Sequence, residues 1–295
     1  PSLVSAIDDL NHASLVDQMA TIANQVNSLR ELTSTNNASS KLMSRDEFRV
    51  YNEEEWFKDY DEEANNDSLT TLVLLGLVES DFDLRQMYLD SYGSNVLGFY
   101  DDEENTMVTV SDTENLTDSG KSTYAHEYTH ALQFNNHNLE EIGLSEEGWE
   151  QDSERAAAIQ AVIEGEATLV GTLWREVVFA NKNYENVIGS EEADSSRPEM
   201  PTWYLLDIYF PYANGYNFVA NVYSNGGWDA VNTLYETPPV STEMIMHPQK
   251  YWDHDIPIAV DAINIQDTLG ADWQEVESGV MGEYWTYLIL RESIA

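Results

Sequence analysis

Cysteine is absent from this chain of 295 residues, and cationic side chains are scarce. The lack of cysteine excludes disulfide bonds and thiolate ligands, so a metal site would have to use histidine, aspartate or glutamate. Lysine and arginine together number 13 against 54 aspartates and glutamates, which gives a formal net charge of −41. A charge of this sign disfavours binding to nucleic acid and to anionic membrane surfaces.

Long apolar runs are missing as well. No stretch reaches the roughly 18 apolar residues of a membrane-spanning helix, so we expect no transmembrane segment in this chain. The opening letters PSLVSAIDDLNHASLV lack the basic and apolar regions of an intact secretory signal. We therefore expect either a mature exported form or an artificial boundary at this end.

The acidic residues are scattered along the whole chain. A hydrophobic content of 42% and an aromatic content of 11% nevertheless predict a folded core. Self-repulsion at this charge opposes a compact fold in dilute buffer, whereas 1 M salt screens charges beyond about 3 Å. The composition therefore predicts a halophilic protein, whose unfolding midpoint should rise between low and multimolar salt.

The first 42 residues are predicted to form an N-terminal helical segment, followed by one main domain over residues 43–295. Within residues 2–33, apolar side chains recur at steps of three and four: Leu15, Met19, Ile22, Val26 and Leu29. Such a stripe fits a helix packed on its own domain, a dimer through the N-terminal helix, or an inhibitory segment. The polar letters TSTNNASSK, residues 33–41, predict a linker.

The main domain reads as α+β, mostly helical, with one small sheet ahead of the central helix. Two β-prone runs at residues 96–100 and 107–110 flank an acidic turn and predict a hairpin. We expect one helix capped by Asp118 or Ser119 and a second over residues 152–182, capped by Asp152 or Ser153. Beyond residue 200, further helices should be broken at Pro211, at Gly226–Gly227 and at Pro238–Pro239.

The letters HEYTH place His126 and His130 four residues apart, with Glu127 directly after the first. Positions i and i+4 share one helix face, so both imidazoles can bind the same ion. At this composition, chance produces such a motif in at most about 2% of chains. Glu127 lies about 100° around the helix, which suits a general base beside a metal-bound water.

A catalytic zinc site needs three protein ligands and one open position. The candidates for the third ligand are Glu164 and Glu166 in the letters VIEGEATLV. They are about 200° apart on a helix, so only one can face the metal. Glu166 falls within the apolar stripe of that helix, while Glu164 lies among small residues that would let the HExxH helix approach. Gly165 also predicts a close neighbouring helix.

The combination of HExxH with a later helix that carries glutamate resembles the gluzincin metallopeptidases. The letters IEGEA are similar to the family signature in which the first glutamate completes the zinc site. The resemblance implies Zn²⁺ as the cofactor and Glu164 as the third ligand, with Glu166 either supporting that ligand or serving the structure of the fold. His130 and Glu164 are 34 positions apart, so a loop should be inserted between their helices.

Further pieces resemble a group of secreted or membrane-anchored HExxH proteins from haloarchaea and other prokaryotes. They include LGFYD, AHEYTHALQ, FPYANGYNFV and GGWDAVNTLYETPPVSTEMIMHPQKY, and with the glutamate motif they span residues 97–251. The resemblance implies a zincin-like fold, an archaeal origin, an extracellular or cell-surface location and peptidase chemistry on a peptide or protein substrate.

Peptidase chemistry also needs an edge strand for the extended substrate and a donor for the developing oxyanion. We expect the strand at 96–100 or 107–110 to bind the peptide. His247 is the first candidate for the donor, with Tyr216, Tyr223 and Tyr251 as alternatives. His12, His137 and His254 are part of no recognisable motif, and we expect them to be structural or surface groups.

The sequence thus predicts a zinc-dependent metallopeptidase adapted to high salt. The alternative is a non-catalytic extracellular binding or assembly protein that retains a zincin fold with structural zinc. An intact Glu127 favours the enzyme, because a structural site has no need of a base there.

Overall fold

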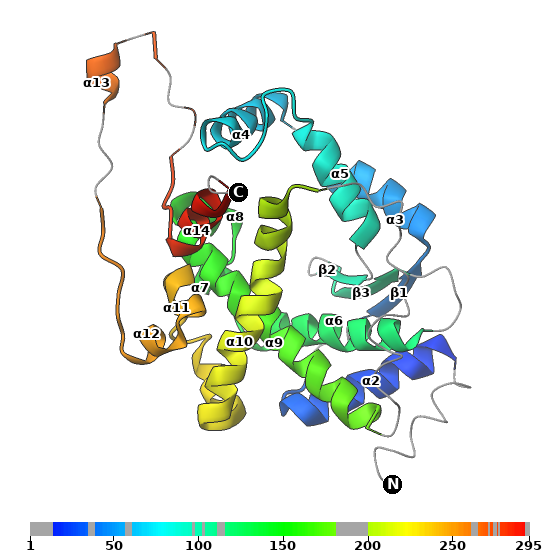
Figure 1. Ribbon diagram of the computed structural model, residues 1–295. Coiled ribbons are helices and arrows are strands. Elements are labelled where there is room, and N and C mark those ends of the chain that lie inside the picture. Colours follow the sequence, from blue (N-terminus) through cyan, green and yellow to red (C-terminus); the bar gives the residue numbers. More distant parts are fainter. Residues whose placement is uncertain are drawn as a thin grey trace.

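The computed structural model describes residues 14–34, 39–56, 61–95, 98–101, 104–110, 116–180, 200–260, 265–270, 272–273, 276 and 278–292. His12 lies outside these residues. Over the described part of the chain, helices dominate and one small sheet lies beside them (Figure 1). The predicted α+β, mostly helical class is therefore confirmed. None of the described helices is both long and apolar enough to cross a bilayer.

The sheet has three strands in the order β1-β3-β2, with β3 (Thr106–Val110) in the middle. All five residues of β3 are buried, as expected for a central strand covered on both faces. β2 (Gly98–Asp101) pairs with β3 in antiparallel fashion, so the predicted hairpin is confirmed. Its outer edge carries no further strand among the described residues.

The third strand, β1 (Ser39–Met43), runs parallel to β3. The expected linker over residues 33–41 is therefore wrong at its end, where a strand begins. The first three residues of β1 are polar or charged and exposed, which is why the letters read as a linker. Only Leu42 and Met43 carry the apolar character of a strand. The expected boundary at residue 42 falls inside this strand.

Two central helices carry the histidines and the glutamates of the sequence motifs. Helix α6 (Asp118–Asn136) begins at Asp118 and is capped one residue earlier than expected by Thr117, whose hydroxyl accepts from the backbone N–H of Gly120. Helix α9 (Ser153–Val178) is capped by Asp152, as predicted. Between them lie the short helices α7 (Leu139–Ile142) and α8 (Glu146–Gln151), which form the expected insertion.

Helix α10 (Thr202–Thr233) crosses α9 at close range (Figure 1). The crossing is made by Gly165 of α9 and Gly215 of α10, and a Cβ on either would overlap the backbone of the other helix. Gly165 was expected to face a close helix, but that helix is α10 rather than the HExxH helix. The predicted break at Pro211 is wrong, because α10 runs through it and leaves helical geometry only at Gly226 and Gly227.

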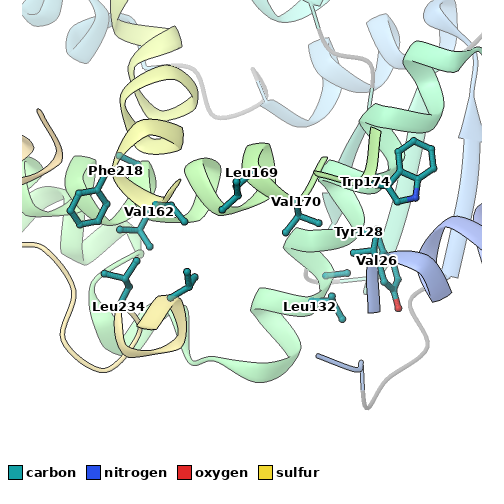
Figure 2. Close-up of a cluster of buried hydrophobic side chains, with 14 of the residues drawn as sticks. Val26, Tyr128, Leu132, Val162, Leu169, Val170, Trp174, Phe218 and Leu234 are labelled. Carbon is teal, nitrogen blue, oxygen red and sulfur yellow. The ribbon is translucent and has the colours of Figure 1, made fainter. Parts of the chain in front are cut away.

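The main core lies where α2 (Leu15–Arg30), α6, α9 and α10 meet. Met19, Ile22 and Val26 of the N-terminal stripe are buried in it, so the stripe packs within the chain, and its use for a dimer is not supported. Hydrogen bonds also hold α2 against the other helices; for example, the indole of Trp174 in α9 donates to Gln25 in α2. Figure 2 labels part of this core: Val26, Tyr128, Leu132, Val162, Leu169, Val170, Trp174, Phe218 and Leu234.

The remaining helices surround this body. α3 (Arg45–Tyr51) continues into a π-helical turn (Asn52–Trp56) and leads towards α4 (Glu62–Leu74) and α5 (Leu84–Asn95). After α10 the chain forms α11 (Thr242–Met246), α12 (Pro248–Trp252), α13 (Gln266–Leu269) and α14 (Glu283–Glu292).

A buried carboxylate joins the start of α9 to α11. Glu154 accepts hydrogen bonds from the backbone N–H and the hydroxyl of Thr242, both at 2.7 Å, through one oxygen. Its other oxygen is buried with no hydrogen-bond partner among the described residues. Burial raises the pKa of Glu154, although the bonds from Thr242 oppose this, and Asp152 and Glu243 raise it further.

Glu154→Gln should therefore stabilise the protein at neutral pH. A raised folded-state pKa means that the native carboxyl contributes stability at low pH, which is lost as pH rises through that pKa. The amide keeps the two bonds from Thr242 without a buried charge, so we expect a gain of about 1 kcal/mol at pH 7. Chemical denaturation at pH 4 and pH 7 checks this, with Gln151→Glu on the exposed surface as a control. A native chain more stable than the variant at pH 7 would contradict the expectation.

Candidate metal centre

Helix α6 presents the two motif histidines on one face. His126 and His130 are one turn apart, and their Nε2 atoms lie 3.2 Å from each other. The rings stand nearly at right angles, with centroids 4.9 Å apart. Both Nε2 atoms thus point to one position, as the spacing predicts.

Helix α9 brings the third group to the same position. The Oε2 atom of Glu164 lies 3.2 Å from Nε2 of His126 and 3.4 Å from Nε2 of His130. Gly171, two turns further along α9, keeps the helices close, because a Cβ there would already be 3.7 Å from the Cβ of His126. We call these three side chains, His126, His130 and Glu164, the ligand cluster.

The distances within the ligand cluster fit a tetrahedral ion. Ligand atoms about 2.0–2.1 Å from one such ion stand about 3.3–3.4 Å from each other. The three separations of 3.2, 3.2 and 3.4 Å are close to these values. With three ligands of this type, a fourth position is left for water or substrate, as in catalytic zinc sites.

The ligand cluster is strongly coupled electrostatically. Burial lowers the pKa of His130, but the charge and hydrogen bond of Glu164 more than reverse this and raise the pKa to about 9. Burial alone would raise the pKa of Glu164, whereas the neighbouring histidines hold that pKa well below its usual range. A divalent cation bound at the ligand cluster would replace the protons of the histidines as the positive charge that stabilises the Glu164 carboxylate.

Glu127 lies beside the ligand cluster without belonging to it. Burial raises the pKa of its carboxyl, the two histidines lower the pKa, and Glu164 raises it again, with a raised value as the net result. A carboxylate whose pKa is moved towards neutrality is better matched to general base catalysis near pH 7.

Strand β2 lies next to Glu127 at Gly98. A Cβ placed on Gly98 of β2 would lie 3.4 Å from Cγ of Glu127 and 2.9 Å from the carbonyl oxygen of Val108. Glycine therefore lets β2 approach the motif helix closely. β2 is an outer strand of the sheet, because among the described residues only β3 pairs with it.

Glu166 faces away from the ligand cluster. It is fully buried and binds Nε of Arg30, from helix α2, at 2.5 Å. The hydroxyl of Tyr235 donates to its second oxygen. The structure thus brings Glu164 to the histidines, and gives Glu166 a separate ion pair with the N-terminal helix.

His247 lies between α11 and α12, with Nε2 2.9 Å from Glu283 of α14. It is half-exposed and belongs to none of the contacts that join the ligand cluster. The alternatives Tyr216, Tyr223 and Tyr251 pack against the main core as half-buried side chains. Nothing in these contacts directs any of the four towards the ligand cluster.

The remaining histidines behave as structural or surface groups. His137 stacks on the ring of Tyr235 with centroids 3.7 Å apart, and burial lowers the pKa of its imidazole. His254 is exposed after α12.

Sequence reasoning missed two residues that touch the ligand cluster. Tyr212 of α10 stacks on the ring of His126, with centroids 5.9 Å apart, and 41% of the tyrosine is exposed. Gln133 of α6 contacts Nδ1 of His130 at 2.8 Å through Oε1. The spacing from His130 to Gln133 is i, i+3 on one helix, so this contact could have been found. Tyr212 comes from a distant helix and gave no such signal.

No protein-family model matches the chain, and no curated protein matches it. Among solved structures, the chain is similar to a protein from Chloroflexus aurantiacus that is provisionally described as a hydrolase with a novel fold. The TM-score is 0.50 at 17% sequence identity, over 81% of this chain and 89% of the other. At this identity the likeness concerns the fold. Membership of the zincin family stays a prediction.

Proposed function

We propose that the protein is a zinc-dependent metallopeptidase whose zinc ion is held by the ligand cluster. The observation that supports this most strongly is the set of three ligand atoms at tetrahedral separations, with Glu127 directly beside them. The hydrolase description of the Chloroflexus protein is compatible with the same class of reaction.

Zinc held by His126, His130 and Glu164 would activate a water for attack on a peptide carbonyl. Glu127 accepts a proton from that water, and the raised pKa of its carboxyl suits it to hold the proton. The same carboxyl then delivers the proton to the leaving amine, so that each cycle returns Glu127 to its ionised form.

The outer strand β2 is the proposed platform for the substrate. An extended peptide can add to an open strand edge through backbone hydrogen bonds, which bind many sequences without reading their side chains. Gly98 of this strand lies against Glu127. A peptide bound there passes the ligand cluster, which favours a peptide over a small ester as the substrate.

Tyr212 is our proposed donor to the developing oxyanion, in place of His247. Its ring lies against a metal ligand and is partly exposed, so it borders the entrance to the ligand cluster. A phenol at this position can donate a hydrogen bond to negative charge that forms on a carbonyl oxygen.

The proposed setting is concentrated salt outside the cell. The supporting observation is the net charge of −41, which self-repels unless salt screens it.

Removal of metal tests the proposed function. In molar salt, a chelator such as 1,10-phenanthroline should abolish cleavage of a denatured protein substrate, because the water is no longer activated. Stoichiometric zinc should restore cleavage, while calcium and magnesium should not, since both prefer all-oxygen sites. Zinc binding without cleavage of any peptide in a broad library would instead favour the non-catalytic binding or assembly protein.

A further inference from the structure

The orientation of the Gln133 side chain follows from its partners. Nε2 of Gln133 lies 3.0 Å from the carbonyl oxygen of Ile163, which can only accept a hydrogen bond. The amide nitrogen of Gln133 must therefore face Ile163, and Oε1 must face His130. Because Oε1 can only accept, Nδ1 of His130 carries the proton. In a neutral or metal-bound imidazole, the lone pair of His130 is therefore on Nε2, the atom that points to Glu164 and His126.

The hydrogen bonds continue from Gln133 into the core. Gln133 is fully buried, and its side chain lies close enough to Tyr235 to lower the pKa of that phenol, against the larger rise caused by burial. Tyr235 in turn donates to Glu166, whose other oxygen binds Arg30. Nδ1–H of His130 therefore donates away from the ligand cluster, and the hydroxyl of Tyr235 donates to the buried carboxylate of Glu166.

We propose that Gln133 is a positioning residue for the metal site. It fixes the tautomer and the ring orientation of His130, and through Tyr235 it connects that histidine to the Arg30–Glu166 ion pair. Partners that accept the second N–H of a metal-bound histidine fix its tautomer and strengthen its bond to the metal. The usual partner is a single carboxylate or carbonyl, whereas here an amide and a phenol lie between the histidine and the carboxylate. The inference rests on the proposed function in one respect, because it assumes that the ligand cluster binds a metal ion.

The native protein allows a first test. In the zinc-loaded chain with ¹⁵N-labelled histidine, long-range ¹H–¹⁵N spectra should show a protonated Nδ1 and a metal-bound Nε2 for His130. Assignment follows from the loss of this signal in His130→Ala. A metal-bound Nδ1 or a protonated Nε2 at His130 would overturn the inference, whatever the activity of the protein.

The second test compares two buried glutamines. Gln133→Leu should weaken zinc binding about 10- to 100-fold in competition with a chelator, because the ring of His130 loses its partner. Gln25→Leu is the matched control, since Gln25 is also buried but its side chain accepts a hydrogen bond from the indole of Trp174. It should lower stability and leave zinc affinity unchanged.

Tyr235→Phe separates the relay from the first contact. It keeps Gln133 beside His130 and removes the hydroxyl that leads to Glu166, so zinc affinity should fall by less than in Gln133→Leu. It also provides the measurement if Gln133→Leu does not fold. Native zinc affinity in both Gln133→Leu and Tyr235→Phe would contradict the positioning role, and so would an equal loss in Gln25→Leu. If either result is obtained while the native protein binds zinc and cleaves peptides, this inference fails and the proposed function stands.

Discussion

Replacing Glu127 with glutamine should reduce the rate of peptide hydrolysis about 100- to 10,000-fold while zinc remains bound. The amide has the size of the carboxylate but cannot accept the proton of the attacking water. None of the three ligand atoms is altered, so the affinity for zinc should stay near that of the native chain. Turnover of a quenched fluorescent peptide in molar salt, measured together with bound zinc, gives both quantities on one sample.

Glu176→Gln is the matched control for this variant. Glu176 lies exposed near the end of α9, so the same loss of one charge there should leave turnover unchanged. Equal turnover in Glu127→Gln and the native chain would show that Glu127 is not the base. A loss of zinc in Glu127→Gln would instead mean that Glu127 helps to hold the metal.

Arg30→Met should destabilise the fold by about 3–5 kcal/mol. The arginine side chain is fully buried, and the substitution leaves the Glu166 carboxylate in the core with no cation beside it. Arg30 also lies over the ring of Trp228 and donates to Asn232 at 2.6 Å, so the change removes more than one contact. Denaturation by guanidinium or urea measures the difference in the free energy of unfolding.

Two further variants identify the cause of that loss. The double variant Arg30→Met with Glu166→Leu should recover a large part of it, because no unpaired charge is left in the core. Arg49→Met removes the exposed partner of Asp46 and should change stability by less than about 1 kcal/mol. A cost for Arg30→Met no greater than that for Arg49→Met would show that the buried pair does not hold α2 to the body.

Local spacing was enough to predict the central parts of the site. The i, i+4 histidines require only that α6 be a helix, and the capped, apolar letters after Asp152 define α9 clearly. The choice of Glu164 over Glu166 was left open by periodicity and made by the resemblance of IEGEA. The structure shows the physical difference, since Glu164 meets the histidines and Glu166 meets a buried arginine.

Features that depend on distant partners could not be predicted. β1 is mostly polar, and it becomes a strand because β3 offers it a free edge. Pro211 should break a helix, but burial of its neighbours Phe210 and Phe218 offsets the lost hydrogen bond. Arg30 gave no sign of its role either, because its partners lie 136 and 202 positions further along the chain.

The central claim is that one zinc ion is bound by His126, His130 and Glu164, and a crystal of the zinc-loaded protein tests it most directly. An anomalous difference map recorded at the zinc edge should show one strong peak per chain, about 2.0–2.2 Å from both Nε2 atoms and from a carboxylate oxygen of Glu164. No peak at these residues, or a peak on other side chains only, would contradict the account.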